Sequence, residues 1–380
     1  MSSRLCIITI WFCFITLLVL GIVMVASTGL CAATAPGESP EAFIYKQAGF
    51  AVLGVAVALG LSWVDYHIWR RWVWWILGIC VVLLAMCFMP VVGVNLNGEH
   101  RWVDLGVRFQ PSELAKITLV MVLAHWFTTH REMSGTFWKG FALPGILFGG
   151  PLMLILFEKD MGTSAALAMT GFCLMYAAGT RWWLLLLSIL IGALMLYWMT
   201  VSNDNRLERI YAWQDPRTYS QGAGAQQWIS MLAFARGGLT GTGLGDGIEK
   251  YGKLPFAHTD FIFAEIGEEW GLVGSVSVVL LFTTLTISGF IMALQSQETY
   301  GRLMALGLVC TIFWPAALNM MVVTSMLPNT GLPLPFISYG GTNLVMTIAS
   351  IGLLTSIQRH TPIIRQNYWP QRRILENQKL

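Results

Sequence analysis

The sequence predicts an all-helical protein that crosses a membrane many times. Of its 380 residues, 56% are hydrophobic and only 11% are charged, and the mean hydropathy is +0.63. A content of 17 Trp and 38 Gly is typical of membrane bundles rather than soluble folds. We expect a single transmembrane domain over residues 1–380, with no separate soluble domain. The net charge of +3 indicates nothing about nucleic acid.

Ten apolar runs are each expected to form one transmembrane helix. We expect the first to be a span rather than a cleaved signal peptide, because about 25 apolar residues exceed a secretory core. The seven cysteines lie mostly in these runs without metal-ligand spacing, which predicts small buried side chains and no intramolecular disulfide. The runs cover about 6–30, 47–64, 72–93, 112–128, 140–157, 162–179, 182–201, 262–293, 302–324 and 343–357.

Basic residues predict the orientation of the chain. Ten spans place both termini on one side, and most Lys and Arg of the short loops fall there, so that side is cytoplasmic. The large loop at about 202–261, between helices 7 and 8, then lies outside the cytoplasm. The basic tail at about 358–380 lies inside, near anionic lipid. The glycine-rich stretch 237–247 lacks the Gly-Lys-Ser/Thr ending of a phosphate-binding loop and is expected to be close-packed or mobile backbone.

Asp260 stands where the large loop meets the eighth apolar run. An ionisable group at such a boundary usually faces water, lines a cavity or pairs with another group. An Asp before an apolar run is also a common helix N-cap, and both interpretations are open. Several titratable neighbours within about three helical turns favour a functional site that acts on an extracytoplasmic or lipid-borne substrate. These neighbours are His258, Glu265, Glu268 and Glu269.

Two further polar clusters are expected on the same side. Glu113 and Lys116 follow Pro111 with i, i+3 spacing, so they project from one helix face as part of a site or as a local ion pair. Asp160 is at the tip of a tight connection between two helices, where turn chemistry is an alternative explanation.

The stretch 327–342 combines three prolines and three glycines between two spans. Non-helical backbone at membrane depth is tolerated where protein buries it or where it lines a cavity. We therefore expect a re-entrant segment. Its Ser338 is a candidate donor to a polar head group, and a purely structural plug is the alternative.

Three runs of the sequence resemble motifs of the SEDS family (RodA, FtsW, SpoVE), in the family's order and over nearly the whole chain. They are Gln110-Pro-Ser-Glu-Leu-Ala-Lys116, His258-Thr-Asp-Phe-Ile-Phe263 with Gly267-Glu-Glu269, and Gly331-Leu-Pro-Leu-Pro-Phe-Ile-Ser-Tyr-Gly-Gly341. Gly267-Glu-Glu269 and the loop Gly243-Leu-Gly245 resemble FtsW more than RodA. The chain departs from the family pattern at Phe256, at Glu158 and Lys159, and at Thr342 and Asn343.

The resemblance implies a peptidoglycan glycosyltransferase that polymerises lipid II at the outer face of the bacterial cytoplasmic (inner) membrane, for cell division or elongation. The family's essential aspartate falls on Asp260, which is expected to act as the general base. The departing undecaprenyl pyrophosphate needs positive charge from Lys, Arg or a divalent cation, Mg²⁺ or Mn²⁺, for which Asp160 or Asp260 are candidate ligands. The expected substrate-binding residues are Arg101, Glu113, Lys116, Asp160, Lys253, His258 and Ser338, with Arg236 as a further candidate.

The resemblance also implies partners, namely a single-span class B penicillin-binding transpeptidase and other membrane proteins of division or elongation. Two alternatives to the enzyme are a lipid II flippase and a non-catalytic scaffold. A flippase needs polar groups at mid-membrane and on both faces, whereas the middle of each apolar run is nearly free of charge. A scaffold needs no polar site and leaves the one predicted here unexplained.

Overall fold

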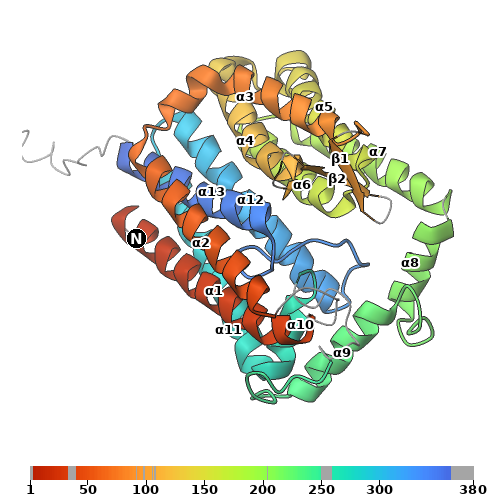
Figure 1. Ribbon diagram of the computed structural model, residues 1–380. Coiled ribbons are helices and arrows are strands. Elements are labelled where there is room, and N and C mark those ends of the chain that lie inside the picture. Colours follow the sequence, from red (N-terminus) through yellow and green to blue (C-terminus); the bar gives the residue numbers. More distant parts are fainter. Residues whose placement is uncertain are drawn as a thin grey trace, which may run out of the picture.

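The computed structural model describes residues 3–32, 40–90, 92–96, 99–104, 106, 108–202, 204–249 and 259–360. These residues form a helical bundle with one small sheet (Figure 1), which confirms the predicted helical class. The longer helices are α1 (Ser3–Ala32), α2 (Pro40–Trp63), α3 (His67–Met86), α4 (Pro111–Thr129), α5 (Leu143–Phe157), α6 (Met161–Ala177), α7 (Trp182–Val201), α11 (Gly271–Gln295), α12 (Thr299–Val323) and α13 (Gly341–His360).

Each predicted apolar run contains a helix. In the described part of the chain, six helices are long and apolar enough to cross a membrane, and two shorter apolar stretches lie in α6 and α7. The chain is therefore a multi-pass membrane protein. The six are Arg4–Thr28, Ala42–Trp63, His67–Met86, Trp138–Phe157, Gly271–Gln295 and Thr299–Val323.

The centre of the bundle is formed by α4, α12 and α13. Most side chains of these three helices are buried. α12 packs against α4, α6 and α11, and α13 packs against α2. α7 lies at the edge (Figure 1) and exposes Leu187, Leu190 and Leu194. Apolar side chains exposed on one outer helix are expected where the surrounding solvent is lipid.

The run at 262–293, predicted as one helix, is two. α10 (Ile262–Glu269) ends at Trp270, and α11 begins at Gly271. Gly271 adopts a φ of +64°, a left-handed conformation that side chains disfavour. The amide of Leu272 donates to the carbonyl of Gly238 at 2.9 Å, so a distant loop caps the break.

The large loop predicted at 202–261 is partly helical. It contains α8 (Asp204–Gln214) and α9 (Ala225–Gly237). The glycine-rich stretch that follows is close-packed, one of its two predicted states: a Cβ on Gly237 would overlap the carbonyl oxygen of Gly267, and one on Gly241 that of Glu269. Thr242 and Gly243 donate backbone N–H groups to the carbonyls of Glu268 and Glu269.

A small antiparallel sheet precedes α4, where the sequence predicted only a loop. Its strands are β1 (Gly93–Leu96), β2 (Glu99–Asp104) and β3 (Arg108–Phe109), in the order β1-β2-β3. β2 carries Arg101. The remaining helical turns are η1 (Arg131–Met133) and η2 (Trp138–Ala142).

We expect Gly237→Ala to lower the melting temperature of the purified protein, because overpacking of this kind typically costs about 1–3 kcal/mol. Gly78→Ala is the matched control, since a Cβ on Gly78 meets nothing within 4 Å and alanine favours the helix. Thermal unfolding in detergent measures both. Equal melting temperatures for the two variants would contradict the close packing of the glycine-rich loop.

Candidate functional site

The loop 327–340 brings the predicted polar clusters to one end of the bundle. The hydroxyl of Ser338 donates to the carbonyl of Thr259 at 2.6 Å, which ties the loop to the residue before Asp260. A Cβ on Gly162, two residues after Asp160, would meet Leu332. The helix that follows the loop carries Asn343, whose amide donates to Glu113 Oε1 at 3.3 Å.

Asp260 is half-buried in a turn just before α10. The N-cap of α10 is Phe261, so Asp260 lies one residue before the cap position that the N-cap alternative gave it. Its Oδ2 lies 3.5 Å from the position a Cβ on Gly331 would take. The carboxylate therefore faces the loop 327–340 at a residue without a side chain.

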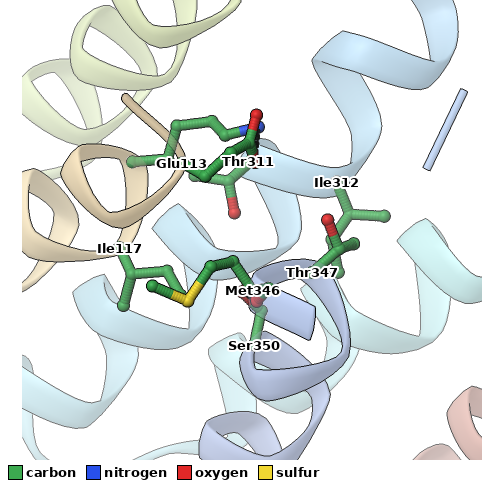
Figure 2. A pocket seen from close by; sticks show the side chains of 8 residues that line it. Glu113, Ile117, Thr311, Ile312, Met346, Thr347 and Ser350 are labelled. Atoms are coloured by element: carbon green, nitrogen blue, oxygen red, sulfur yellow. Dashed lines mark hydrogen bonds and ion pairs between the residues drawn. The ribbon is translucent and has the colours of Figure 1, made fainter. Parts of the chain in front are cut away.

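Glu113 and Lys116 form an ion pair inside the bundle. Lys116 Nζ lies 2.7 Å from Glu113 Oε2, and the two side chains are 8% and 2% exposed. Removing one member of such a pair leaves an uncompensated buried charge. Beside the pair is a polar cavity of about 10 Å³, which is large enough to hold one water molecule (Figure 2). The hydroxyl residues that line it are Thr311, Thr347 and Ser350.

Asp160 caps α6, as the turn-chemistry alternative predicts. Its carboxylate accepts the backbone N–H of Thr163 at 3.0 Å and the Gln110 amide at 3.3 Å. Arg101 reaches over from β2, with Nε 3.9 Å from Asp160 Oδ2 and Nη2 donating to the carbonyl of Lys159 at 3.0 Å. With 16% of its side chain exposed, Arg101 clamps the connection between α5 and α6 at the rim of the site.

No three His, Cys, Asp or Glu side chains among the described residues are arranged to hold a metal ion. The groups that face the Asp160 carboxylate are N–H groups of Gln110 and Thr163 and the Arg101 guanidinium, and an N–H group does not ligate a cation. Because N–H donors already bind the Asp160 carboxylate, the described residues around Asp160 do not form a cation site.

The other residues predicted to bind substrate either lie outside the described residues or bind other parts of the protein. Lys253, His258 and the departure at Phe256 lie outside the described residues. Ser338 accepts the backbone N–H of Leu334 at 2.7 Å while it donates to Thr259, a structural role. Arg236 is paired with Glu249 at 2.6 Å.

The three glutamates of α10 anchor the glycine-rich loop. A Cβ on Gly247 would lie 3.2 or 3.3 Å from a carboxylate oxygen of each of them. Glu268 accepts the backbone N–H of Ile248 at 2.9 Å, and Glu269 accepts the hydroxyl of Ser27 at 2.6 Å. These three glutamates lie close to Asp260 in the sequence, but in the structure they pack against the glycine-rich loop.

Sequence reasoning gave no role to three carboxamides that the structure places at this end of the bundle. Gln47 pairs with the backbone of Ser338 and Gly340, Asn343 contacts Glu113, and Asn319 contacts the Asp260 backbone. Asn319 left a signal in the sequence, because a carboxamide inside an apolar membrane run usually has a specific partner.

A second, apolar groove of about 410 Å³ lies between α9, α10, α11 and α12. Its lining includes Phe234, Phe263, Met320 and Met321, and no lining residue is titratable. General acid or base chemistry needs a titratable group, so this groove is not the candidate catalytic site.

Fold and site define a class: a multi-pass helical membrane protein with a half-buried carboxylate and a buried Lys–Glu pair gathered around the loop 327–340. The chain belongs to the FtsW, RodA and SpoVE family, because residues 7–363 match the family model described as a cell cycle protein. The resemblance found in the sequence is thereby confirmed.

Similar proteins agree with this assignment. A probable peptidoglycan glycosyltransferase FtsW from Geobacter metallireducens is 37% identical over 338 residues, which cover 89% of this chain and 90% of the relative. Stage V sporulation protein E of Bacillus subtilis is 33% identical over 347 residues, or 91% and 94% of the two chains. The FtsW-like character predicted from the sequence is borne out.

Solved structures have the same fold. One chain comes from work on the structural coordination of polymerization and crosslinking by a peptidoglycan synthase complex; its TM-score is 0.78 at 27% identity, with 92% of this chain and 96% of that chain covered. Rod shape determining protein RodA of Thermus thermophilus has a TM-score of 0.68 at 25% identity, with coverage of 93% and 97%.

Glu158 provides a test of the electrostatics around the site. It is fully buried next to Cys87 and Asp160. Burial, and then the negative charge of Asp160, raise the pKa of Glu158 to about 8. A carboxyl with a raised pKa in the folded state loses stabilising free energy as the pH rises from its ordinary value, about 4.5, through 8.

We expect Glu158→Gln to gain melting temperature relative to the unsubstituted protein between pH 5 and pH 8, and the gain to level off above that range. Gln keeps the size of the neutral acid and cannot ionise. Glu132→Gln, at an exposed position, is the control and should show no such trend. A constant difference from pH 5 to pH 9 would show that Glu158 does not titrate in this range.

Proposed function

We propose that the protein is a peptidoglycan glycosyltransferase that polymerises lipid II at the outer face of a bacterial inner membrane. The observation that carries this proposal is the placement of Asp260, half-buried and facing Gly331 of the re-entrant loop. Membership of the family, and relatives that bear the name peptidoglycan glycosyltransferase, support it.

The proposal includes a membrane topology. We assign ten spans in a single transmembrane domain, both termini to the cytoplasm, and the end with Asp260 to the outer side. The ten helices found at the ten apolar runs support this count, together with the basic residues of the opposite loops.

The reaction joins two lipid-linked disaccharides. A hydroxyl of one attacks the anomeric carbon of the other, and its proton passes to the Asp260 carboxylate as the new C–O bond forms. The bond between the anomeric carbon and the pyrophosphate breaks, and undecaprenyl pyrophosphate leaves with the electron pair. A general base of this kind typically contributes about 10²–10⁴-fold in rate.

Basic residues at the same end stabilise the departing pyrophosphate. Arg101 is partly exposed at the rim, so its guanidinium is better placed than the Lys116 ammonium to face a phosphate. Lys116 is enclosed with Glu113, so we assign it to the charge and shape of the cavity wall. Lys253 and His258 remain candidates from the sequence.

The proposed partner is a class B penicillin-binding transpeptidase, which would crosslink the strands made by this protein. The structural neighbour from a peptidoglycan synthase complex, in which polymerization and crosslinking are coordinated, supports a partner of this kind.

Asp260→Asn keeps the size of the side chain and removes its basicity. We expect the purified variant to polymerise lipid II at least about 100-fold more slowly than the unsubstituted protein, assayed with magnesium and with or without the transpeptidase. Asp246→Asn, an exposed carboxylate in the glycine-rich loop, should keep full activity.

Full polymerase activity in the Asp260→Asn protein would exclude Asp260 as the base. If no condition yielded glycan strands while vesicles with the protein translocated lipid II, the protein would be a flippase.

A further inference from the structure

Asn319 is a buried carboxamide in the apolar helix α12. It is 1% exposed, and its Nδ2 donates to two backbone carbonyls, that of Asp260 at 2.7 Å and that of Leu332 at 2.6 Å. Both hydrogens of the amide are therefore used. A polar group buried in apolar surroundings is costly unless it is hydrogen-bonded, so these two bonds also fix the side chain itself.

The two carbonyls belong to segments about 70 residues apart in the sequence. One belongs to the residue proposed as the base, and the other to the loop 327–340. Leu332 directly follows Gly331, the residue that the Asp260 carboxylate faces. One amide thus sets the distance between the Asp260 backbone and the surface opposite its carboxylate.

We propose that Asn319 is a positioning residue for Asp260. It touches no reacting atom and acts by holding the Asp260 backbone against the loop 327–340. The bond from Ser338 to the carbonyl of Thr259 holds the preceding residue in the same way. This inference rests on the proposed role of Asp260, and its test must separate the two.

The chain offers a matched control in Gln227 of α9. Its amide is 2% exposed and also donates to two backbone carbonyls, that of Val322 at 3.2 Å and that of Leu327 at 2.7 Å. These acceptors lie at the end of α12 and the start of the same loop. A purely structural loss should therefore affect both carboxamides, whereas a loss of positioning should affect Asn319 alone.

The experiment compares Asn319→Leu with Gln227→Met, each of similar volume to the residue it replaces. We expect both to lower the melting temperature. Asn319→Leu should reduce kcat for lipid II polymerisation by about 10–100-fold with KM within about twofold, because a misplacement near 1 Å costs about that much. Gln227→Met should keep kcat within about twofold. Equal kcat losses in the two variants would overturn the proposal.

A double substitution tests whether the effect passes through Asp260. In the Asp260→Asn background, Asn319→Leu should reduce the residual rate no further, since residues that act as a unit are non-additive. A further loss of the same size would show that Asn319 acts elsewhere. If Asn319→Leu does not fold, Asn319→Ser, which keeps one donor, enters the same cycle and should show the same non-additivity.

The outcomes for the base and for the positioning residue are distinct. An active Asp260→Asn protein removes the proposed base, whatever Asn319 does. An inactive Asp260→Asn protein with normal kcat in Asn319→Leu keeps the base and removes the positioning role.

Discussion

The structure depends on satisfying the polar backbone of a non-helical segment inside an apolar bundle. A helix pairs its own N–H and C=O groups, but the non-helical loop 327–340, rich in proline and glycine, cannot. Side chains from several helices supply the missing partners: Asn319 binds Leu332, Gln227 binds Leu327, and Ser338 closes the turn. Asn319 and Ser338 also bind the carbonyls of Asp260 and Thr259, so two of these side chains join the loop to the proposed base.

The buried charged side chains likewise have partners inside the bundle. The Glu113 and Lys116 charges are enclosed and paired, and Glu268 accepts two backbone N–H groups from the glycine-rich loop. Asp260 differs from these carboxylates because it is half-buried at the end of the bundle. A carboxylate that keeps access to a bound hydroxyl is suited to accept a proton, whereas an enclosed one is suited to hold structure.

The sequence predicted the helices well and their interruptions poorly. Each apolar run located by hydropathy contains a helix in the structure, because a membrane helix needs a long uncharged run. Hydropathy missed the break at Gly271, because it does not register a left-handed glycine or the bond from Leu272 to the carbonyl of Gly238 in the large loop. It also missed the short strands around Arg101 and the helices of the large loop, which are too polar or too short for that signal.

By itself, the sequence determined the class of protein, the family and the residue proposed as the base, since these follow from composition and contiguous motifs. Tertiary structure decided which polar residues share a site. The glutamates beside Asp260 in sequence turn toward the glycine-rich loop, while Asn319, some 60 residues away, binds the Asp260 backbone. The physical reason is that a buried hydrogen bond joins whatever groups the packing of helices brings within about 3 Å, and sequence separation does not encode that distance.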